Sequence, residues 1–197
     1  GVAVRVLQNP PSAEDRAVIS TTAFLESHGI TVTLHPQGTL GGAFLVVDQQ
    51  VVWAGSWELS QEGLTQDAAY VLRWDIAPLA RDFHREFAEM VEQGAFGPSS
   101  PKNTSSPFIA IFEAASMDVY MTPEDDPLAD ILQRMASSKY EIVVMTEVLN
   151  DPRVEQRMID QAPLTGMHVW GVVSPAQNLT TNLEKLLRLG VQIPPYR

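Results

Sequence analysis

The sequence contains no cysteine, which excludes disulfide bonds and metal sites built on thiolates and leaves the cellular compartment open. Basic side chains are scarce, because 13 Lys and Arg stand against 24 Asp and Glu, a net charge of −11. Neither half of the chain carries the clustered Lys and Arg that bind phosphate backbones. Nucleic acids and anionic membrane surfaces are therefore poor candidates for partners. No apolar run reaches the length that crosses a bilayer.

The composition is otherwise that of an ordinary globular protein, with 45% hydrophobic residues in a chain of 197. That length fits one domain or two small ones. The sequence begins at Gly1 with GVAVRVL, a pattern typical of the middle of a fold, and no signal peptide can be read there. We therefore expect a fragment of a longer protein, and the sequence does not indicate its localisation.

Strand-like and helix-like segments alternate along the chain. The pattern predicts strands at residues 2–7, 30–34, 44–47, 51–54, 67–74, 108–112, 117–121, 140–145, 166–173 and 190–193. It predicts helices at residues 13–27 and 76–92, from residue 127 onward, and at 152–161 and 179–189. Such an alternation indicates an α/β fold with a mixed, partly parallel sheet.

Local signals refine these elements. Asp126 before Pro127 and Asp151 before Pro152 are typical of helix starts. The nearly unbroken apolar run at 140–145 predicts a strand in a sheet that is covered on both faces. For the helix at 76–92, the predicted buried stripe is Leu79, Phe83, Phe87, Met90 and Val91. For the helix after 127, it is Leu128, Ile131, Leu132 and Met135.

One internal repeat is visible. Residues 1–30 run from a strand through a loop and a helix to a glycine before the next strand, and residues 166–191 repeat that order. A repeat of this length and separation is typical of a duplicated module. Between the two halves, residues 97–106 (GPSSPKNTSS) have the composition of a linker.

The segment 41–58, GGAFLVVDQQVVWAGSWE, predicts a buried hairpin with Asp48-Gln49-Gln50 as its turn. Its spacing matches H-x-K-x4-D-x6-G-S-x-N, the motif of the phospholipase D superfamily, with Asp48, Gly55 and Ser56 in register. The flanking segments resemble that superfamily in the same order. Gly41, Ala43 and Glu58 stand where the motif has His, Lys and Asn.

This resemblance implies a phospholipase D-like fold, with a mixed, mostly parallel β-sheet flanked by helices on both faces. Residues 1–96 resemble the C-terminal part of one such module and residues 107–197 the N-terminal part of a second. In the family two modules meet so that both motifs form one active site. The resemblance therefore implies either closure of the two halves of the chain on each other or pairing of the chain with itself, as a homodimer or by exchange of modules.

The family reaction needs a motif His that attacks phosphorus, with Lys and Asn to stabilise charge on the phosphoryl oxygens. Gly41 and Ala43 supply neither group, and the carboxylate of Glu58 repels phosphate. Residues 67–69, Asp-Ala-Ala, also replace polar residues of the family. We expect Asp48 to serve the hairpin turn and Gly55-Ser56 a tight bend, so these six motif positions are vestigial and none is catalytic.

The resemblance thus implies a pseudoenzyme: a catalytically inactive phospholipase D-like domain with a structural, assembly or ligand-binding role. The alternative is the scaffold half of a phosphodiesterase, a hydrolase or nuclease whose intact motif lies outside this chain. A small phosphorylated ligand stays undetermined under either hypothesis.

No other group of residues predicts a catalytic or cofactor site, and no metal is expected. The run Glu124-Asp125-Asp126, with Asp130, could hold Ca²⁺ or Mg²⁺, but helix capping is the preferred interpretation. Ser56 and Ser60 have no His or acid at the spacing of a serine hydrolase. No two histidines stand at the sequence spacing of a metal-ligand pair; the four are His28, His35, His84 and His168. Tryptophans expected in the core or at its rim are Trp53, Trp57, Trp74 and Trp170.

Overall fold

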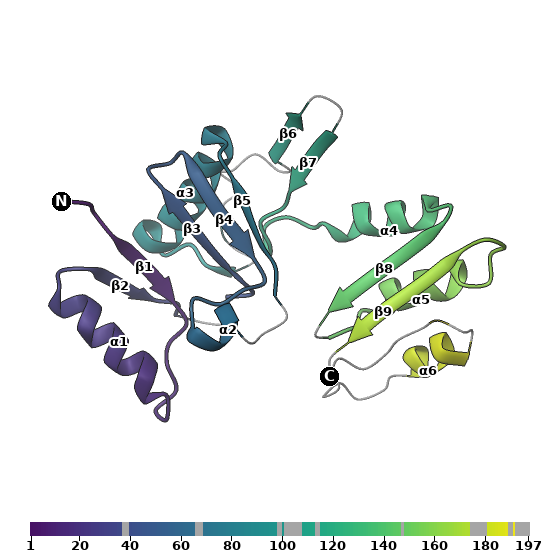
Figure 1. The fold of residues 1–197 in the computed structure, drawn as a ribbon, viewed down its shortest axis with the longest axis horizontal. Helices are drawn as coiled ribbons and strands as arrows, with labels where there is room; N and C mark the ends of the chain where they lie inside the picture. Colours follow the sequence, from purple (N-terminus) through teal and green to yellow (C-terminus); the bar gives the residue numbers. More distant parts are fainter. Residues whose placement is uncertain are drawn as a thin grey trace. The chain divides into compact units, whose positions relative to one another are not determined.

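A computed structural model describes residues 1–36, 40–65, 69–97, 100, 108–112, 115–146, 148–173, 181–188 and 191. The described chain is a mixed α/β protein with six helices and four small sheets (Figure 1). It divides into two compact units, Gly1–Asp125 and Asp126–Arg197, and each has its own apolar core. None of the helices in these residues combines the length and the apolar character that a membrane span requires.

The first unit opens with a β-α-β arrangement. Strands β1 (Arg5–Gln8) and β2 (Thr31–Leu34) pair in parallel, and helix α1 (Arg16–Ser27) connects them. Helix α1 begins after Asp15, whose carboxylate accepts a hydrogen bond from the Val18 N–H at 3.1 Å. The predicted strand-helix-strand order is confirmed, and the capping by Asp15 explains why the helix begins later than residue 13.

Three antiparallel strands and a long helix form the centre of the first unit. Strands β3 (Ala43–Val47), β4 (Val51–Gly55) and β5 (Val71–Trp74) are hydrogen-bonded in that order, with the short helix α2 (Gln61–Thr65) between β4 and β5. Helix α3 (Ala77–Gln93) packs on one face of this sheet through Leu79 and Phe83, against Val52 and Phe44. It ends at Gly94, whose φ of 65° is left-handed.

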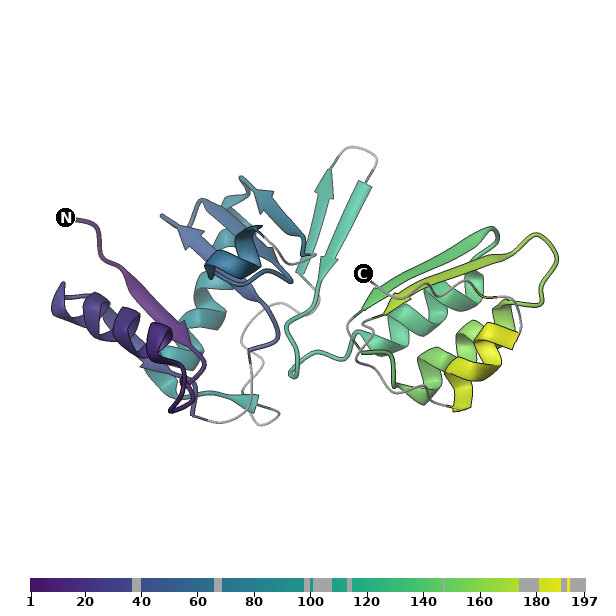
Figure 2. The same ribbon diagram turned by 60° about the horizontal axis from the view of Figure 1, so that its bottom comes forward.

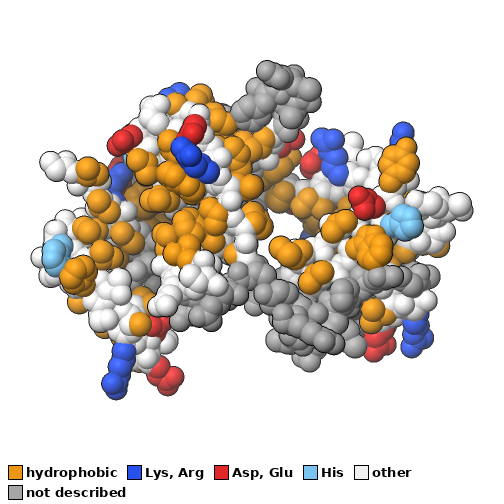
Figure 3. Space-filling model, in the orientation of Figure 1, with side chains coloured by type: hydrophobic (Ala, Val, Ile, Leu, Met, Phe, Trp, Pro, Cys, Tyr) orange, Lys and Arg blue, Asp and Glu red, His pale blue; other side chains and the backbone are white. Residues whose placement is uncertain are grey.

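The other face of the β3-β4-β5 sheet is apolar and exposed. Leu45 is 42% exposed, Val47 40% and Val71 44%, because alternate side chains of a strand point to opposite faces. Figure 3 shows hydrophobic side chains gathered over this sheet on the visible face. Next along the chain, β6 (Phe108–Phe112) and β7 (Ala115–Val119) form an antiparallel hairpin. Met117, Val119 and the following Met121 pack against the apolar core that α3 forms with the β3-β4-β5 sheet.

The second unit alternates helix and strand: α4 (Leu128–Ser137), β8 (Glu141–Thr146), α5 (Pro152–Gln161), β9 (His168–Val173) and α6 (Thr181–Arg188). Strands β8 and β9 pair in parallel from Glu141↔His168 to Thr146↔Val173. The three helices lie on the same side of this pair (Figures 1 and 2). Ile142 and Val169 face them and meet Met158 in the core.

The prediction that residues 140–145 are covered on both faces is wrong for the described chain. Val143 is 68% exposed and Met145 is 61% exposed, while their neighbour Ile142 is buried. The apolar run made both faces of the strand hydrophobic, but α4, α5 and α6 cover only one of them. Ile131 of α4, at 43% exposed, likewise does not belong to the buried stripe predicted for that helix.

The α/β class is confirmed at the level of a mixed α/β protein. The described strands do not form one mostly parallel sheet: β1-β2 and β8-β9 are parallel pairs, whereas β3-β4-β5 and β6-β7 are antiparallel. A short turn joins β3 to β4, a segment with α2 joins β4 to β5, and the helices α1 and α5 join the strands of the parallel pairs. Most of the linker predicted at 97–106 and of the strand predicted at 190–193 falls outside the described residues, and the module boundary stays a prediction.

Candidate functional site

The motif segment 41–58 forms the predicted hairpin, with β3 and β4 joined at Asp48-Gln49-Gln50, but the prediction that it is buried is wrong for one face, where Leu45 and Val47 are exposed. Asp48 and Gln49 have φ angles of 51° and 55°, and the Gln50 N–H donates to the carbonyl oxygen of Val47 at 3.0 Å. Two successive residues with positive φ form a turn whose twist matches that of paired strands, and Asp tolerates this conformation better than most residues. Asp48 therefore has the turn role that the sequence predicted.

The strand register separates the six motif positions into two groups. Ala43 pairs with Gly55, so Gly41, Ser56 and Glu58 flank the same open end of the hairpin. Asp48 lies at the opposite end, since the four residue steps from Ala43 to Val47 span about 13 Å. The open end carries few functional groups: Gly41 has no side chain, Ala43 has a methyl group, and the side chains of Ser56 and Glu58 are exposed.

Gly55 and Ser56 hold β5 against the hairpin. A Cβ atom on Gly55 would collide with the carbonyl oxygen of Tyr70, so a glycine is required for this close approach. The Tyr70 N–H donates to the Ser56 hydroxyl at 3.3 Å, which adds a side-chain bond beside the strand pairing. These contacts support the predicted structural role of Gly55 and Ser56. Among the described contacts, none brings a base to the Ser56 hydroxyl that could activate it as a nucleophile.

Trp57, which the sequence placed in the core or at its rim, anchors the open end from inside. Its side chain is 6% exposed, and its indole Nε1–H donates to the carbonyl oxygen of Ala43 at 3.0 Å. Trp57 thus fastens the segment after β4 to the start of β3.

Residues 67–69 differ from the polar residues that the resemblance predicts there. Residues 67 and 68 fall outside the described chain, and Ala69 is half-buried.

The histidines do not gather at the hairpin. The His28 ring packs on Phe24 at the end of α1, with 4.3 Å between centroids, and the His35 ring contacts Phe96 at 4.6 Å. His84 Nε2 lies 3.3 Å from the Arg5 guanidinium, and His168 is exposed at the start of β9. No histidine therefore joins a potential metal-ligand group in the part of the chain that the structure describes.

The acidic run at 124–126 divides between two roles. Asp126 accepts the Leu128 N–H at 3.0 Å at the start of α4, and Asp130 pairs with Arg134 at 3.3 Å along the same helix. The prediction that Asp126 is the N-cap of α4 is wrong by one residue, because Pro127 holds that position without a side-chain cap and the helix begins at Leu128. For Glu124 and Asp125 the capping interpretation is wrong, because both are buried, at 8% and 6% exposed, in the turn after β7.

Glu124 joins two glutamates of α3 in a buried group that we call the acidic cluster: Glu86, Glu89 and Glu124. One carboxylate oxygen from each lies within 4.8 Å of the other two. Glu86 is 8% exposed, and its Oε2 has no hydrogen-bond partner among the described residues. Burial, and after it repulsion from Glu124, Glu89 and Asp125, together raise the pKa of Glu86 to about 7.

Sequence reasoning missed Glu86 and Glu89, although a signal was present. The predicted buried stripe of α3 runs through Leu79 and Phe83, and the next position on that face is Glu86 rather than Phe87. Phe87 and Met90 are only half-buried, while Glu86 and Glu89 are buried. Two acids three residues apart on the apolar face of a helix could have marked the cluster.

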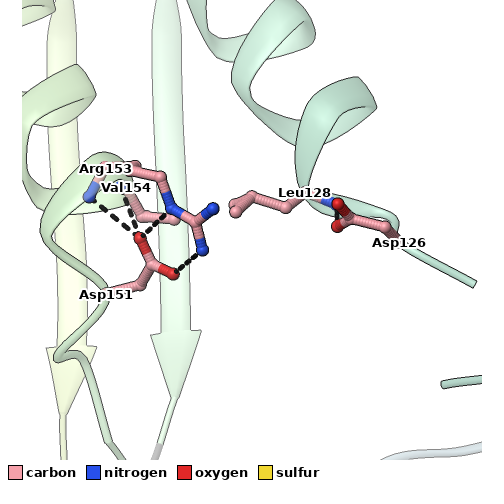
Figure 4. A network of polar contacts seen from close by, with 5 residues as sticks. All are labelled: Asp126, Leu128, Asp151, Arg153 and Val154. Carbon is pink, nitrogen blue, oxygen red and sulfur yellow. Dashed lines mark hydrogen bonds and ion pairs between the residues drawn. The ribbon is translucent and has the colours of Figure 1, made fainter. Parts of the chain in front are cut away.

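The second unit holds a different acidic site at the start of α5 (Figure 4). Asp151 accepts hydrogen bonds from the backbone N–H groups of Arg153 at 2.9 Å and Val154 at 3.4 Å, and from the Arg153 guanidinium at 3.1 and 2.7 Å. These bonds, chiefly from the Arg153 side chain, lower the pKa of Asp151 to about 2. The arrangement is a charge-assisted helix cap, as Asp151 before Pro152 predicted.

Arg153 also borders a shallow depression between α4 and α5. Its lining residues are Leu132, Pro152, Arg153, Gln156, Arg157 and Asp160. The Arg153 guanidinium is already bound by Asp151, so this arginine is committed to the cap. The depression therefore offers weaker grounds for a ligand site than the acidic cluster does.

The chain matches no protein-family model and no curated protein sequence. The grounds for a function are therefore the motif hairpin, the acidic cluster and the architecture around them.

Proposed function

We propose that this chain is a catalytically inactive phospholipase D-like domain with a structural, assembly or ligand-binding role. One observation carries the proposal: the hairpin keeps the motif positions that shape the backbone and lacks those that perform the reaction. Asp48 makes the turn, Gly55 admits β5, and Ser56 accepts the Tyr70 N–H. The positions of the nucleophile and of the cation hold Gly41 and Ala43.

The chemistry of phosphodiester cleavage explains why these two losses are decisive. A covalent phosphohistidine needs an imidazole at the motif position, and Gly41 has no side chain. The developing charge on the phosphoryl oxygens needs fixed cations and donors, and the Ala43 methyl group is neither. Glu58 adds an exposed negative charge at the same end of the hairpin, which opposes the binding of a phosphate.

The exposed sheet faces support an assembly role. Parallel strand pairs are normally buried on both faces, yet β8 leaves Val143 and Met145 exposed. In the first unit, the face of β3-β4-β5 opposite α3 is apolar as well. Pairing of the chain with itself, as a homodimer or by exchange of modules, would cover such faces. Sedimentation equilibrium tests this point, and a monomer at all accessible concentrations would contradict it.

Restoring the missing groups tests the origin of the hairpin. The wild-type chain is expected not to hydrolyse bis(p-nitrophenyl) phosphate. The triple variant Gly41→His, Ala43→Lys, Glu58→Asn is expected to bind tungstate, a phosphoryl analogue, at least about tenfold more tightly than the wild type, because it regains a cation and loses a repelling charge.

A matched control makes the same change of two charges at the other end of the hairpin. The variant Asp48→Asn, Gln49→Lys keeps residues that tolerate the turn and is expected to leave tungstate binding unchanged. Equal gains from both variants would mean that only net charge matters and would contradict the proposal. Hydrolysis by wild-type protein that survives extensive purification and is lost on substitution of Ser56 would contradict it directly.

A further inference from the structure

The acidic cluster brings together carboxylates from distant parts of the first unit. Glu86 and Glu89 project from one face of α3, three residues apart, and Glu124 comes from the turn after β7. The turn itself is held in shape, because the Asp125 N–H donates to the Met121 carbonyl oxygen and the Asp125 carboxylate accepts the Met121 N–H, both at 2.8 Å. The cluster is therefore built on a helix and a closed turn.

The donor set and its dimensions fit a hard cation. All three groups offer carboxylate oxygen, which Ca²⁺ and Mg²⁺ prefer, and none offers the nitrogen or sulfur typical of zinc sites. Oxygens on opposite sides of a bound Ca²⁺ are about 4.6–5.2 Å apart, and around Mg²⁺ about 4.0–4.2 Å. No two of the three oxygens are more than 4.8 Å apart, which is within the separation of two oxygens that bind one Ca²⁺.

Glu86 provides an observation that is independent of the number of acids. Glu86 is more than nine-tenths buried, and its Oε2 receives no hydrogen bond from the described residues. A buried carboxylate without a donor is costly, and a neighbouring acid increases the cost. A cation between the three groups would replace the missing donor and reverse the repulsion.

We infer that Glu86, Glu89 and Glu124 bind a hard divalent cation of the class of Ca²⁺ and Mg²⁺. The ion would fasten the turn after β7 to α3 and so stabilise the first unit. This site is separate from the motif hairpin, and the inference does not depend on the proposed function. The competing arrangement is a cluster that shares protons between carboxylates and binds no ion.

The test uses the full chain, freed of metal by EDTA and dialysis. Calorimetric titration with CaCl₂ is expected to show one site per chain, and thermal denaturation is expected to show a rise in melting temperature with CaCl₂. Titrations with MgCl₂ and MnCl₂ identify the preferred ion. Glu86→Gln and Glu124→Gln should each weaken Ca²⁺ binding by about tenfold or more, because each removes a charged ligand.

The matched control is Glu92→Gln, the same substitution on an exposed position of α3. It should leave the affinity for Ca²⁺ unchanged. A distinctive result is expected from Glu86→Gln: melting temperature above wild type in EDTA, where the repulsion is relieved, and below wild type in CaCl₂. The inference is overturned if none of the three ions binds with a defined stoichiometry, or if Glu92→Gln weakens binding as much as the cluster variants do.

Discussion

Two carboxylates of this chain have pKa values shifted in opposite directions. In the first unit, burial and neighbouring acids raise the pKa of Glu86 to about 7. In the second unit, hydrogen bonds from Arg153 lower the pKa of Asp151 to about 2. Glu86 is 8% exposed and faces Glu89, Glu124 and Asp125, whereas the side chain of Asp151 is 35% exposed and accepts backbone and guanidinium hydrogen bonds.

The two sites differ in whether the charged form of the acid stabilises the fold. At a helix start, free N–H groups and the helix dipole favour the charged form, so Asp151 contributes to folding simply by its position. Inside the first unit no such donors face Glu86 Oε2 among the described residues, and its charge opposes folding. A stabilising cap needs no further explanation, whereas the cost of the buried cluster is consistent with the cation site that we infer.

The largest expected effect comes from removing the Glu86 charge without its ion. In EDTA at pH 8, Glu86→Gln is expected to raise the free energy of unfolding by about 1–2 kcal/mol, after allowance for solvent screening. Glutamine has the shape of the protonated glutamate, so the packing around position 86 of α3 should be kept. Urea denaturation measures the effect, with Glu92→Gln as the control. A less stable Glu86→Gln protein would mean that the charge of Glu86 stabilises the first unit, which would contradict its expected contrast with Asp151.

The pH dependence sharpens the same contrast. Because the pKa of Glu86 is about 7 in the folded chain against 4.5 in an ordinary glutamate, the folded state holds the proton more tightly. The stability that this proton gives is fully present below about 4.5 and is lost as pH rises through about 7. In EDTA, wild type and Glu86→Gln should therefore differ most at pH 8 and converge toward pH 5. A constant difference across this range would contradict the raised pKa.

Local signals in the sequence predicted much of the fold. Helix α5 begins at Pro152 because Asp151 caps it, and the hairpin turn falls on Asp48 because that residue tolerates a positive φ. The alternation of strands and helices predicted the α/β class. In each case the deciding interactions join residues within a few positions of one another, so the pattern of the local sequence contains them.

The features that sequence reasoning missed depend on distant contacts. The apolar run of β8 is equally consistent with one covered face or two, and only the positions of α4, α5 and α6 decide that Val143 is exposed. The acidic cluster was half visible, since Glu124 was considered as a cation ligand, but its partner Glu86 lies on α3. Which helix a turn packs against leaves no trace in the local sequence pattern.

The smallest expected effect concerns the cap of the second unit. Asp151→Asn keeps an amide oxygen that can accept the N–H groups of Arg153 and Val154 but removes the charge that binds the guanidinium. The pKa of about 2 lies below the 3.8 of an ordinary aspartate, so the contribution of Asp151 is present above about 3.8 and is lost as pH falls through about 2.

Hydrogen exchange of the Arg153 and Val154 amides reports on this cap directly. We expect faster exchange of both amides in Asp151→Asn than in wild type at pH 6, compared at equal intrinsic rates, and a smaller difference near pH 2, where about half of the wild-type carboxyl is neutral. Asn150→Ala, at the exposed neighbouring position, is the control and should leave both amides protected. If Asp151→Asn and wild type exchange alike at pH 6, the charge of Asp151 contributes nothing to the cap. Asp151 and Glu86 would then differ in burial but not in the sign of the effect of their charges on stability.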